Sequence, residues 1–123
     1  MNLLPPLSPS HITLLRGRYS LPFEDIILIE GQDNYTLFKC RNGHEVLTSK
    51  SLSWYQKCLP PYLFRVHKSY FVNLAFVVSF KGETIRLSDG QCITVSRRRR
   101  REVRKLVKTH LVTPSSFQTS MSV

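Results

Sequence analysis

Five consecutive arginines, Arg97 to Arg101, are the most chemically distinctive residues of this 123-residue sequence. A guanidinium group binds phosphate through a planar fork of N–H donors. Apolar residues at helical spacing follow (Val103, Leu106 and Val107), so we predict an amphipathic helix over 97–111, capped by Ser96. The start of a helix already carries partial positive charge, so each arginine there costs roughly a few tenths of a kcal/mol unless an anion is bound. The run therefore predicts a polyanionic partner.

We expect the arginine run to have no acidic neighbour other than Glu102 to neutralise it. Glu102 directly follows it, and an Arg98–Glu102 pair at i,i+4 would neutralise a single charge. A purely solvated role for the run is therefore costly.

Two other segments carry side chains that could contact a nucleic acid. Lys68 and Ser69 interrupt two apolar strand-like segments after His67, and from an exposed loop such residues can reach phosphates and base edges, so His67, Lys68 and Ser69 are candidate DNA contacts. In the segment 31–35, the amide of Asn34 could read an adenine edge, and Tyr35 could stack on a base or bind a phosphate. Taken alone, each segment is better explained as an ordinary solvated turn.

The residue types used in catalysis and metal binding are scattered. The sequence contains no HExxH, GxSxG, Gly-rich phosphate loop or Cys-His signature. Its histidines are His11, His44, His67 and His110, on separate predicted elements, and its cysteines are Cys40, Cys58 and Cys92. Three widely spaced cysteines make neither a metal pair nor a disulfide framework and are typical of a reducing cytosol. We predict no enzymatic activity, no cofactor and a cytoplasmic location.

The net charge of +10 is concentrated in the second half of the chain. Residues 1–60 contain six Lys/Arg and five Asp/Glu, whereas residues 61–123 contain twelve and three. A basic surface of this kind suggests nucleic acid or an anionic membrane. The longest apolar runs, 26–29 and 74–78, are far too short to span a bilayer, and the N-terminus does not resemble a signal peptide. Nucleic acid is the favoured partner, and no membrane association is expected.

Alternating apolar residues and turn signals predict a mainly β, mostly antiparallel domain with two short helices. Strands are expected over 11–20, 26–29, 35–41, 44–48, 63–67, 70–72, 76–80, 84–87 and 92–95, and helices over 49–59 and 97–111. Asn42-Gly43 is the strongest hairpin signal. A strand directly before the basic helix excludes a helix-turn-helix. We expect a flexible lead over 1–10, one domain over 11–111 and a flexible tail over 112–123.

Three short motifs resemble those of the LytTR-type DNA-binding domain, the output domain of the LytR/AlgR response regulators. His67 to Asn73 (HKSYFVN) resembles its H-R/K-S-Y/F-hydrophobic-V-N core. Val95 to Arg97 (VSR) resembles its V/I-S-R signature, and Ile29 to Tyr35 (IEGQDNY) resembles its early I-E-x-x-x-N-Y segment. The motifs occur in the family's order, and the resemblance covers roughly 20–111.

The resemblance implies a compact fold of short strands and sequence-specific binding of double-stranded DNA. Loops would enter successive major grooves and the duplex would bend. By position, the contacts are Asn34 or Tyr35, Lys68 and Arg97, and the variable length of the first loop leaves its two alternatives open. Arg98 to Arg101 would add phosphate contacts. Direct repeats are the implied targets, bound by two molecules that pair only on the DNA.

Most relatives carry a phospho-receiver domain or a membrane segment before this domain, and the chain leaves no room for either. We therefore expect no regulation by phosphorylation, and either a stand-alone bacterial transcription regulator or an excised domain. The chief rival is a small basic RNA-binding β protein that stacks bases on Tyr19, Tyr35, Tyr70 and Phe71. A module that binds an acidic protein comes next, and a small enzyme last.

Overall fold

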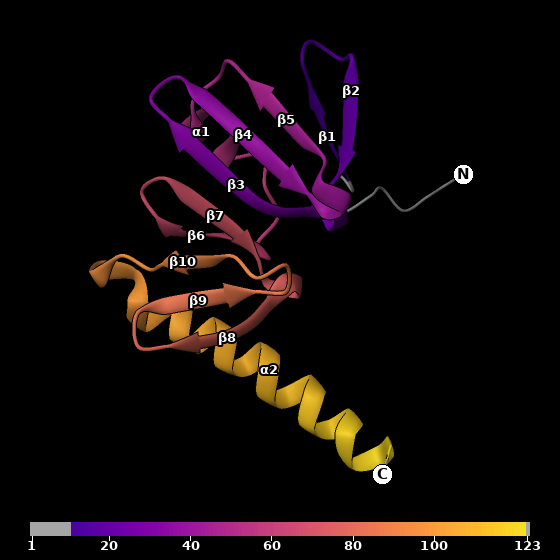
Figure 1. Cartoon of the computed structure of the whole chain (residues 1–123), viewed down its shortest axis with the longest axis vertical. Helices are drawn as coiled ribbons and strands as arrows, with labels where there is room; N and C mark the ends of the chain where they lie inside the picture. Colours follow the sequence, from indigo (N-terminus) through magenta and orange to yellow (C-terminus); the bar gives the residue numbers. More distant parts are fainter. Residues whose placement is uncertain (1–10, 123) are drawn as a thin grey trace, which may run out of the picture.

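The computed structural model describes the backbone of residues 11–122 and the side chains of residues 11–111. In this part of the chain, ten strands form antiparallel sheets of two, five and three strands (Figure 1). The strands are β1 (His11–Leu14), β2 (Tyr19–Pro22), β3 (Ile26–Gln32), β4 (Tyr35–Cys40), β5 (Glu45–Thr48), β6 (Leu63–His67), β7 (Tyr70–Asn73), β8 (Val77–Lys81), β9 (Thr84–Leu87) and β10 (Cys92–Thr94), and the helices are α1 (Leu52–Gln56) and α2 (Arg100–Ser122). The predicted mainly β fold with two helices is confirmed. The lead predicted over 1–10 lies outside the described residues.

The five-stranded sheet, in the order β5-β4-β3-β7-β6, separates two hydrophobic cores. Its central strand is β3, which contains the apolar run 26–29. A bulge between Ile26 and Leu28 breaks the alternation, so Ile26 and Ile29 enter the first core while Ile27 and Leu28 enter the second. The strand expected over 26–29 is therefore confirmed, and it is buried on both faces.

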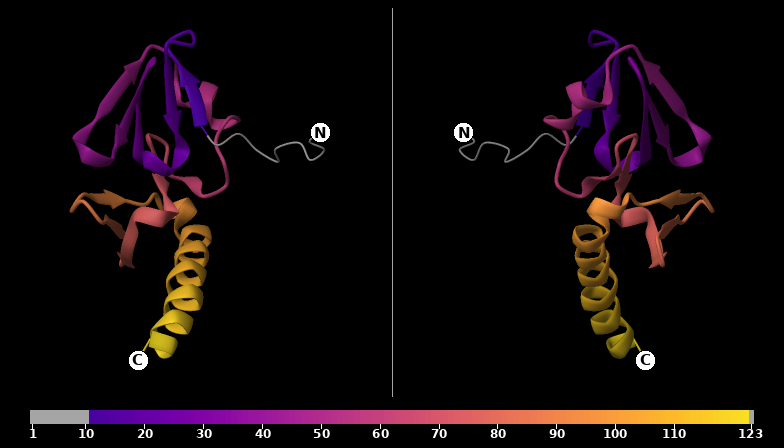
Figure 2. Two further views of the ribbon diagram at one scale, coloured as in Figure 1. Left: turned by 90° about the vertical axis from the view of Figure 1, so that its right-hand side faces the viewer. Right: turned by 90° about the vertical axis from the view of Figure 1, so that its left-hand side faces the viewer.

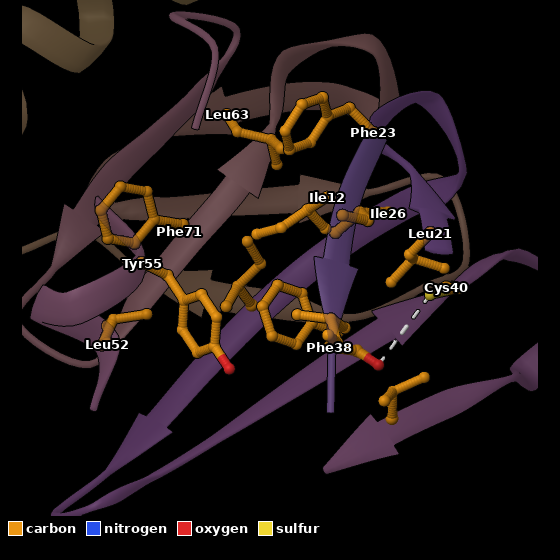
Figure 3. Close-up of a cluster of buried hydrophobic side chains, with 13 residues drawn as sticks. Ile12, Leu21, Phe23, Ile26, Phe38, Cys40, Leu52, Tyr55, Leu63 and Phe71 are labelled. Carbon is orange, nitrogen blue, oxygen red and sulfur yellow. Dashed lines mark hydrogen bonds between the residues drawn. The ribbon is translucent and has the colours of Figure 1, made fainter. Parts of the chain in front are cut away.

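The first core lies between the five-stranded sheet, the β1–β2 hairpin and α1. The rings of Phe38 and Tyr55 meet edge to face with centroids 5.1 Å apart at its centre (Figure 3). The single strand predicted over 11–20 is wrong, because Leu15, Arg16 and Gly17 have positive φ and turn the chain back on itself. Helix α1 forms within the predicted segment 49–59, and its Trp54 N–H donates to Ser51 Oγ at 3.3 Å.

The second core lies between the five-stranded sheet, the β8–β9–β10 sheet and the first turns of α2. Among the side chains that the structure describes in this helix, up to Leu111, the buried ones are Val103 and Val107, and the helix extends away from the sheets (Figure 2). The sequence predicted that the helix ends at 111, whereas its backbone continues through Ser122. The sequence contains no glycine, the usual helix terminator, beyond Leu111. The flexibility of 112–123 stays a prediction.

The start of the basic helix also differs from the prediction. Arg97 to Arg99 form a 3-10 turn that opens with a 3.0 Å bond from Arg99 N–H to the Ser96 carbonyl, and the α-helix begins at Arg100. The Ser96 hydroxyl makes no side-chain cap and instead accepts a bond from Arg99 Nη1 at 3.4 Å. The predicted Ser96 cap is therefore wrong, because the tighter turn satisfies the first N–H from the backbone itself.

The predicted hairpin around Asn42-Gly43 is confirmed. Strand β4 pairs with β5 in the register Thr36 to Thr48, and Asn42 and Gly43 have φ values of 66° and 75°. Asparagine and glycine tolerate these left-handed angles better than other residues.

Candidate nucleic-acid interface

The three segments expected to contact nucleic acid come together at one edge of the molecule. The N–H of Gly31, at the end of β3, donates to the carbonyl of Ser69 at 2.8 Å. The N–H of Ser96, beside the arginine run, donates to the carbonyl of Val66 at 2.8 Å. The β3–β4 turn, the β6–β7 turn and the junction between β10 and α2 accordingly lie along the left side of Figure 1. Backbone bonds thus join segments that are far apart in the sequence.

A bulge in β6 makes one of these bonds possible. Arg65 pairs with Phe71 and His67 pairs with Tyr70, so Val66 is an extra residue in this ladder. The extra residue of a bulge is left out of the strand pairing. The carbonyl of Val66 is therefore available to Ser96, while its side chain is fully buried in the second core. The bulge therefore joins Ser96, directly before the arginine run, to a residue that lies two positions before Lys68.

The turn Lys68-Ser69 presents one exposed side chain, that of Lys68. Ser69 is half-buried, and its N–H donates to His67 Nδ1 at 3.1 Å. His67 is also half-buried, with its ring centroid 5.5 Å from that of Tyr70. Since Nδ1 accepts a hydrogen bond, His67 supports the turn from within, and Lys68 is the residue of this segment best placed to reach a ligand.

The arginine run divides into exposed and structurally engaged members. Arg97, Arg98 and Arg101 are exposed, whereas Arg99 and Arg100 are half-buried. Arg100 binds Glu83 with Nη2 and Oε1 2.5 Å apart, and its Nε donates to the carbonyl of Val95 at 3.2 Å. The expectation that the run has no acidic neighbour besides Glu102 is therefore wrong. Glu83 lies in the β8–β9 turn, which the fold brings to the start of α2.

The β3–β4 turn is shorter than the gap left between the strands expected over 26–29 and 35–41. Gly31 and Gln32 still belong to β3, and the turn itself consists of Asp33, which has φ 50°, and Asn34. Asn34 is exposed at the tip of this turn. Tyr35 is 54% exposed and lines a pocket together with Leu37 and Leu47. Of these two alternatives, Asn34 is placed nearer the tip of the edge.

Two cations of this region were not among the predicted contact residues. Arg65 is half-buried beneath the β6–β7 turn, and its pKa is lowered by burial and by the charge of Arg99. Lys50 follows β5, at the same end of the sheet as the β3–β4 turn, and its carbonyl accepts a 2.7 Å bond from Thr36 Oγ1. The basic segment 65–70 was a sequence signal for Arg65. An isolated lysine such as Lys50 gives no such signal.

The aromatic side chains of the RNA-binding hypothesis do not form one stacking surface. Phe71 is only 3% exposed, and Tyr19 and Tyr70 are half-buried. Tyr19 is hydrogen-bonded to His44 through its hydroxyl. Bases stack on exposed rings, and among these four side chains only Tyr35 is exposed.

Other kinds of site are not evident in the described part of the chain. No group of three His, Cys, Asp or Glu side chains within it could hold a metal ion. None of its helices combines the length and the apolarity needed to cross a bilayer.

Comparisons with known proteins agree with this architecture. A solved LytTr DNA-binding domain, from a Bacillus cereus protein described as a methyl-accepting/DNA response regulator, superimposes with a TM-score of 0.67. The two sequences are 24% identical, and the likeness covers 81% of this chain and 98% of that one, which establishes the shared fold. No curated protein matches the sequence. The family defined as the LytTr DNA-binding domain matches residues 16–108, and the chain therefore belongs to the LytTR family of DNA-binding domains.

Proposed function

We propose that this protein is a transcription regulator that recognises specific duplex sequences through the edge formed by its three turns. The observation that supports this most directly is the pair of 2.8 Å backbone bonds, Gly31 to Ser69 and Ser96 to Val66, which hold these turns side by side. Narrow turns that carry exposed polar tips can enter the major groove, where each base pair presents a distinct pattern of donors and acceptors.

The side chains of this edge divide into base readers and phosphate anchors. Lys68 and Arg97 are exposed on neighbouring segments and are assigned to base edges, with Arg97 binding guanine O6 and N7 through two parallel bonds. Arg98 and Arg101 are assigned to phosphates. Arg99 adds positive charge to this edge from a half-buried position. Arg100 is assigned to the fold, because its guanidinium already binds Glu83.

Asn34 supplies a separate contact from the β3–β4 turn. Its exposed position suits an amide that reads adenine N6 and N7 in an adjacent stretch of groove. Contacts to successive grooves would bend the duplex toward the protein. The expected target is a direct repeat occupied by two molecules. Titration of a labelled duplex of known concentration would test this, because its end point gives the number of protein molecules bound per duplex.

Selection of bound sequences from a random duplex pool tests this function. A common motif should be enriched, and the selected duplex should outcompete both random duplex and single-stranded RNA at one fixed salt concentration. Binding without any enrichment would contradict sequence recognition. Stronger competition by single-stranded RNA than by the selected duplex would contradict DNA recognition and would favour RNA binding instead.

A further inference from the structure

Arg65 is a cation of the DNA-facing edge whose donors are used inside the protein. Its Nη2 donates to the carbonyl of Lys68 at 2.6 Å, and its Nε donates to the carbonyl of His67 at 3.3 Å. Its Nη1 donates to Gln56 Oε1 at 2.8 Å. All three nitrogens of the guanidinium therefore bind protein oxygens, and two of those oxygens belong to the turn that presents Lys68.

The β6–β7 turn needs support of this kind. A two-residue connection between antiparallel strands usually takes left-handed φ angles, which match the twist of the strands. Lys68 and Ser69 are not among the residues with positive φ, and the strand before them contains the Val66 bulge. The backbone of this turn is therefore not set by its own residue types.

Arg65 is itself held in place from two directions. Its guanidinium carbon lies 5.5 Å from the ring centroid of Phe71, which is buried in the first core. Gln56, in α1, fixes the far end of the guanidinium. A planar group with five N–H donors can span two carbonyls and an amide at once, whereas the compact ammonium of lysine cannot.

We propose that Arg65 is a positioning residue that fixes the β6–β7 turn and thereby the direction of Lys68, so that it determines DNA specificity without touching DNA. This inference rests on the proposed function of the edge. A competing explanation is a phosphate contact, because Arg65 and Arg99 line the same cleft. The two explanations predict different salt dependence, since each phosphate contact adds about one to the slope of log Kd against log salt concentration.

The test compares wild type with Arg65→Lys, Arg65→Ala and Gln56→Ala, each checked for folding by its thermal melt. Gln56 is exposed, so its truncation loosens Arg65 without removing a charge or a buried group. Binding is measured on the selected duplex and on random duplex over a range of salt concentrations. We expect Arg65→Lys to lose about tenfold on the selected duplex, which corresponds to about 1.4 kcal/mol. We expect little loss on random duplex, the same salt slope for every variant, and a smaller loss of discrimination for Gln56→Ala.

A double-mutant cycle with Lys68→Ala tests whether Arg65 acts through Lys68. If it does, Arg65→Lys should cost little more once Lys68 has been truncated. Fully additive losses would overturn the inference, as would a salt slope that falls by about one in Arg65→Ala. Full discrimination retained by Gln56→Ala and Arg65→Lys would also overturn it. If wild type itself selects no sequence, the proposed function fails instead, which is a distinguishable result.

Discussion

Two turns of the same five-stranded sheet are built in different ways. The Asn42-Gly43 turn joins β4 to β5 with left-handed angles that its own residues favour. The Lys68-Ser69 turn joins β6 to β7 without such angles and is held by the side chains of Arg65 and His67. One turn is specified by its own sequence, and the other is specified by its surroundings.

Under the proposed function, this difference separates a structural turn, Asn42-Gly43, from a recognition turn, Lys68-Ser69. Residues that must reach a ligand are chosen for their chemistry, so they cannot also be the best turn formers. The conformation of such a turn must then be stabilised by neighbouring groups that do not face the ligand. The comparison predicts that mutations in the Lys68-Ser69 turn mainly weaken DNA binding, whereas mutations in the Asn42-Gly43 turn mainly lower stability.

The largest expected effect is the loss of a base reader from the recognition turn. Lys68→Ala, and likewise Arg97→Ala, should weaken binding to the selected duplex by about 1–3 kcal/mol and relax specificity at one position. Equilibrium binding on selected and random duplex measures this. Arg86, exposed on β9 outside the three segments, provides the control Arg86→Ala. Equal losses of Lys68→Ala on both duplexes would remove its role in base reading.

Truncation in the structural turn should act on stability instead. Asn42→Ala places a residue with a Cβ and no compensating amide at φ 66°, which should lower the free energy of unfolding by about 1 kcal/mol. Urea denaturation measures this loss, and Asn42→Gly is the matched variant that tolerates the same angle. DNA affinity at a temperature where the protein is folded should be unchanged. A specific loss of affinity would place this turn in the interface.

A smaller effect should distinguish two adjacent arginines. Arg101→Ala removes an exposed cation and should weaken all duplexes alike, with the salt slope lowered by about one. Arg100→Ala removes the partner of Glu83 and should lower the melting temperature without changing the slope. Titrations at several salt concentrations, combined with melts, measure both. The same slope change in both variants would show that Arg100 also binds a phosphate.

A further prediction concerns the pH dependence of stability at Cys40, which ends β4 just before the structural turn. Burial, with the carboxylates of Asp25 and Glu45, raises the pKa of its thiol from 9.0 to about 11. The folded state therefore holds the proton more tightly, and the free energy of unfolding should fall as pH rises from about 9 to about 11.

Thiol labelling at pH 8 checks the same environment. The exposed Cys58 and Cys92 should react quickly, and Cys40 only when the structure opens. Asn42→Ala should speed the labelling of Cys40, whereas Arg65→Lys should not. Acceleration by Arg65→Lys would show that the two turns are not independent.

Much of the fold could be predicted from local patterns. Residue type and spacing alone predict the Asn42-Gly43 hairpin and the apolar run of β3. The turn at Leu15 and Arg16 could not be predicted, because neither residue favours the left-handed angles it adopts. The 3-10 start of the basic helix was also missed, because the choice between two kinds of helical turn depends on local backbone bonds.

The sequence named candidate contact residues but did not show how the fold holds them, and their role in DNA contact stays a prediction. Lys68 and Arg97 were named from short motifs, and the structure places their segments together. The engagement of Arg100 by Glu83 and of Arg65 by the turn carbonyls was hidden, because both depend on long-range contacts or side-chain direction. Their shared charge suggested one role for all five arginines, whereas the fold leaves Arg97, Arg98 and Arg101 exposed and half-buries Arg99 and Arg100.

The bulge at Val66 also fixes where this domain can tolerate changes in length. Side chains alternate along a strand, so a single-residue deletion within β6 would change the parity of the positions that follow it. Lys68 would then point to the opposite face of the strand. The Val66 carbonyl that accepts the hydrogen bond from Ser96 N–H would also be lost. Insertions beside the exposed residues Lys57 and Cys58, directly after α1, change no such phase. A library that varies loop length should therefore leave β6 intact, and one that varies specificity can exchange residue 68 alone.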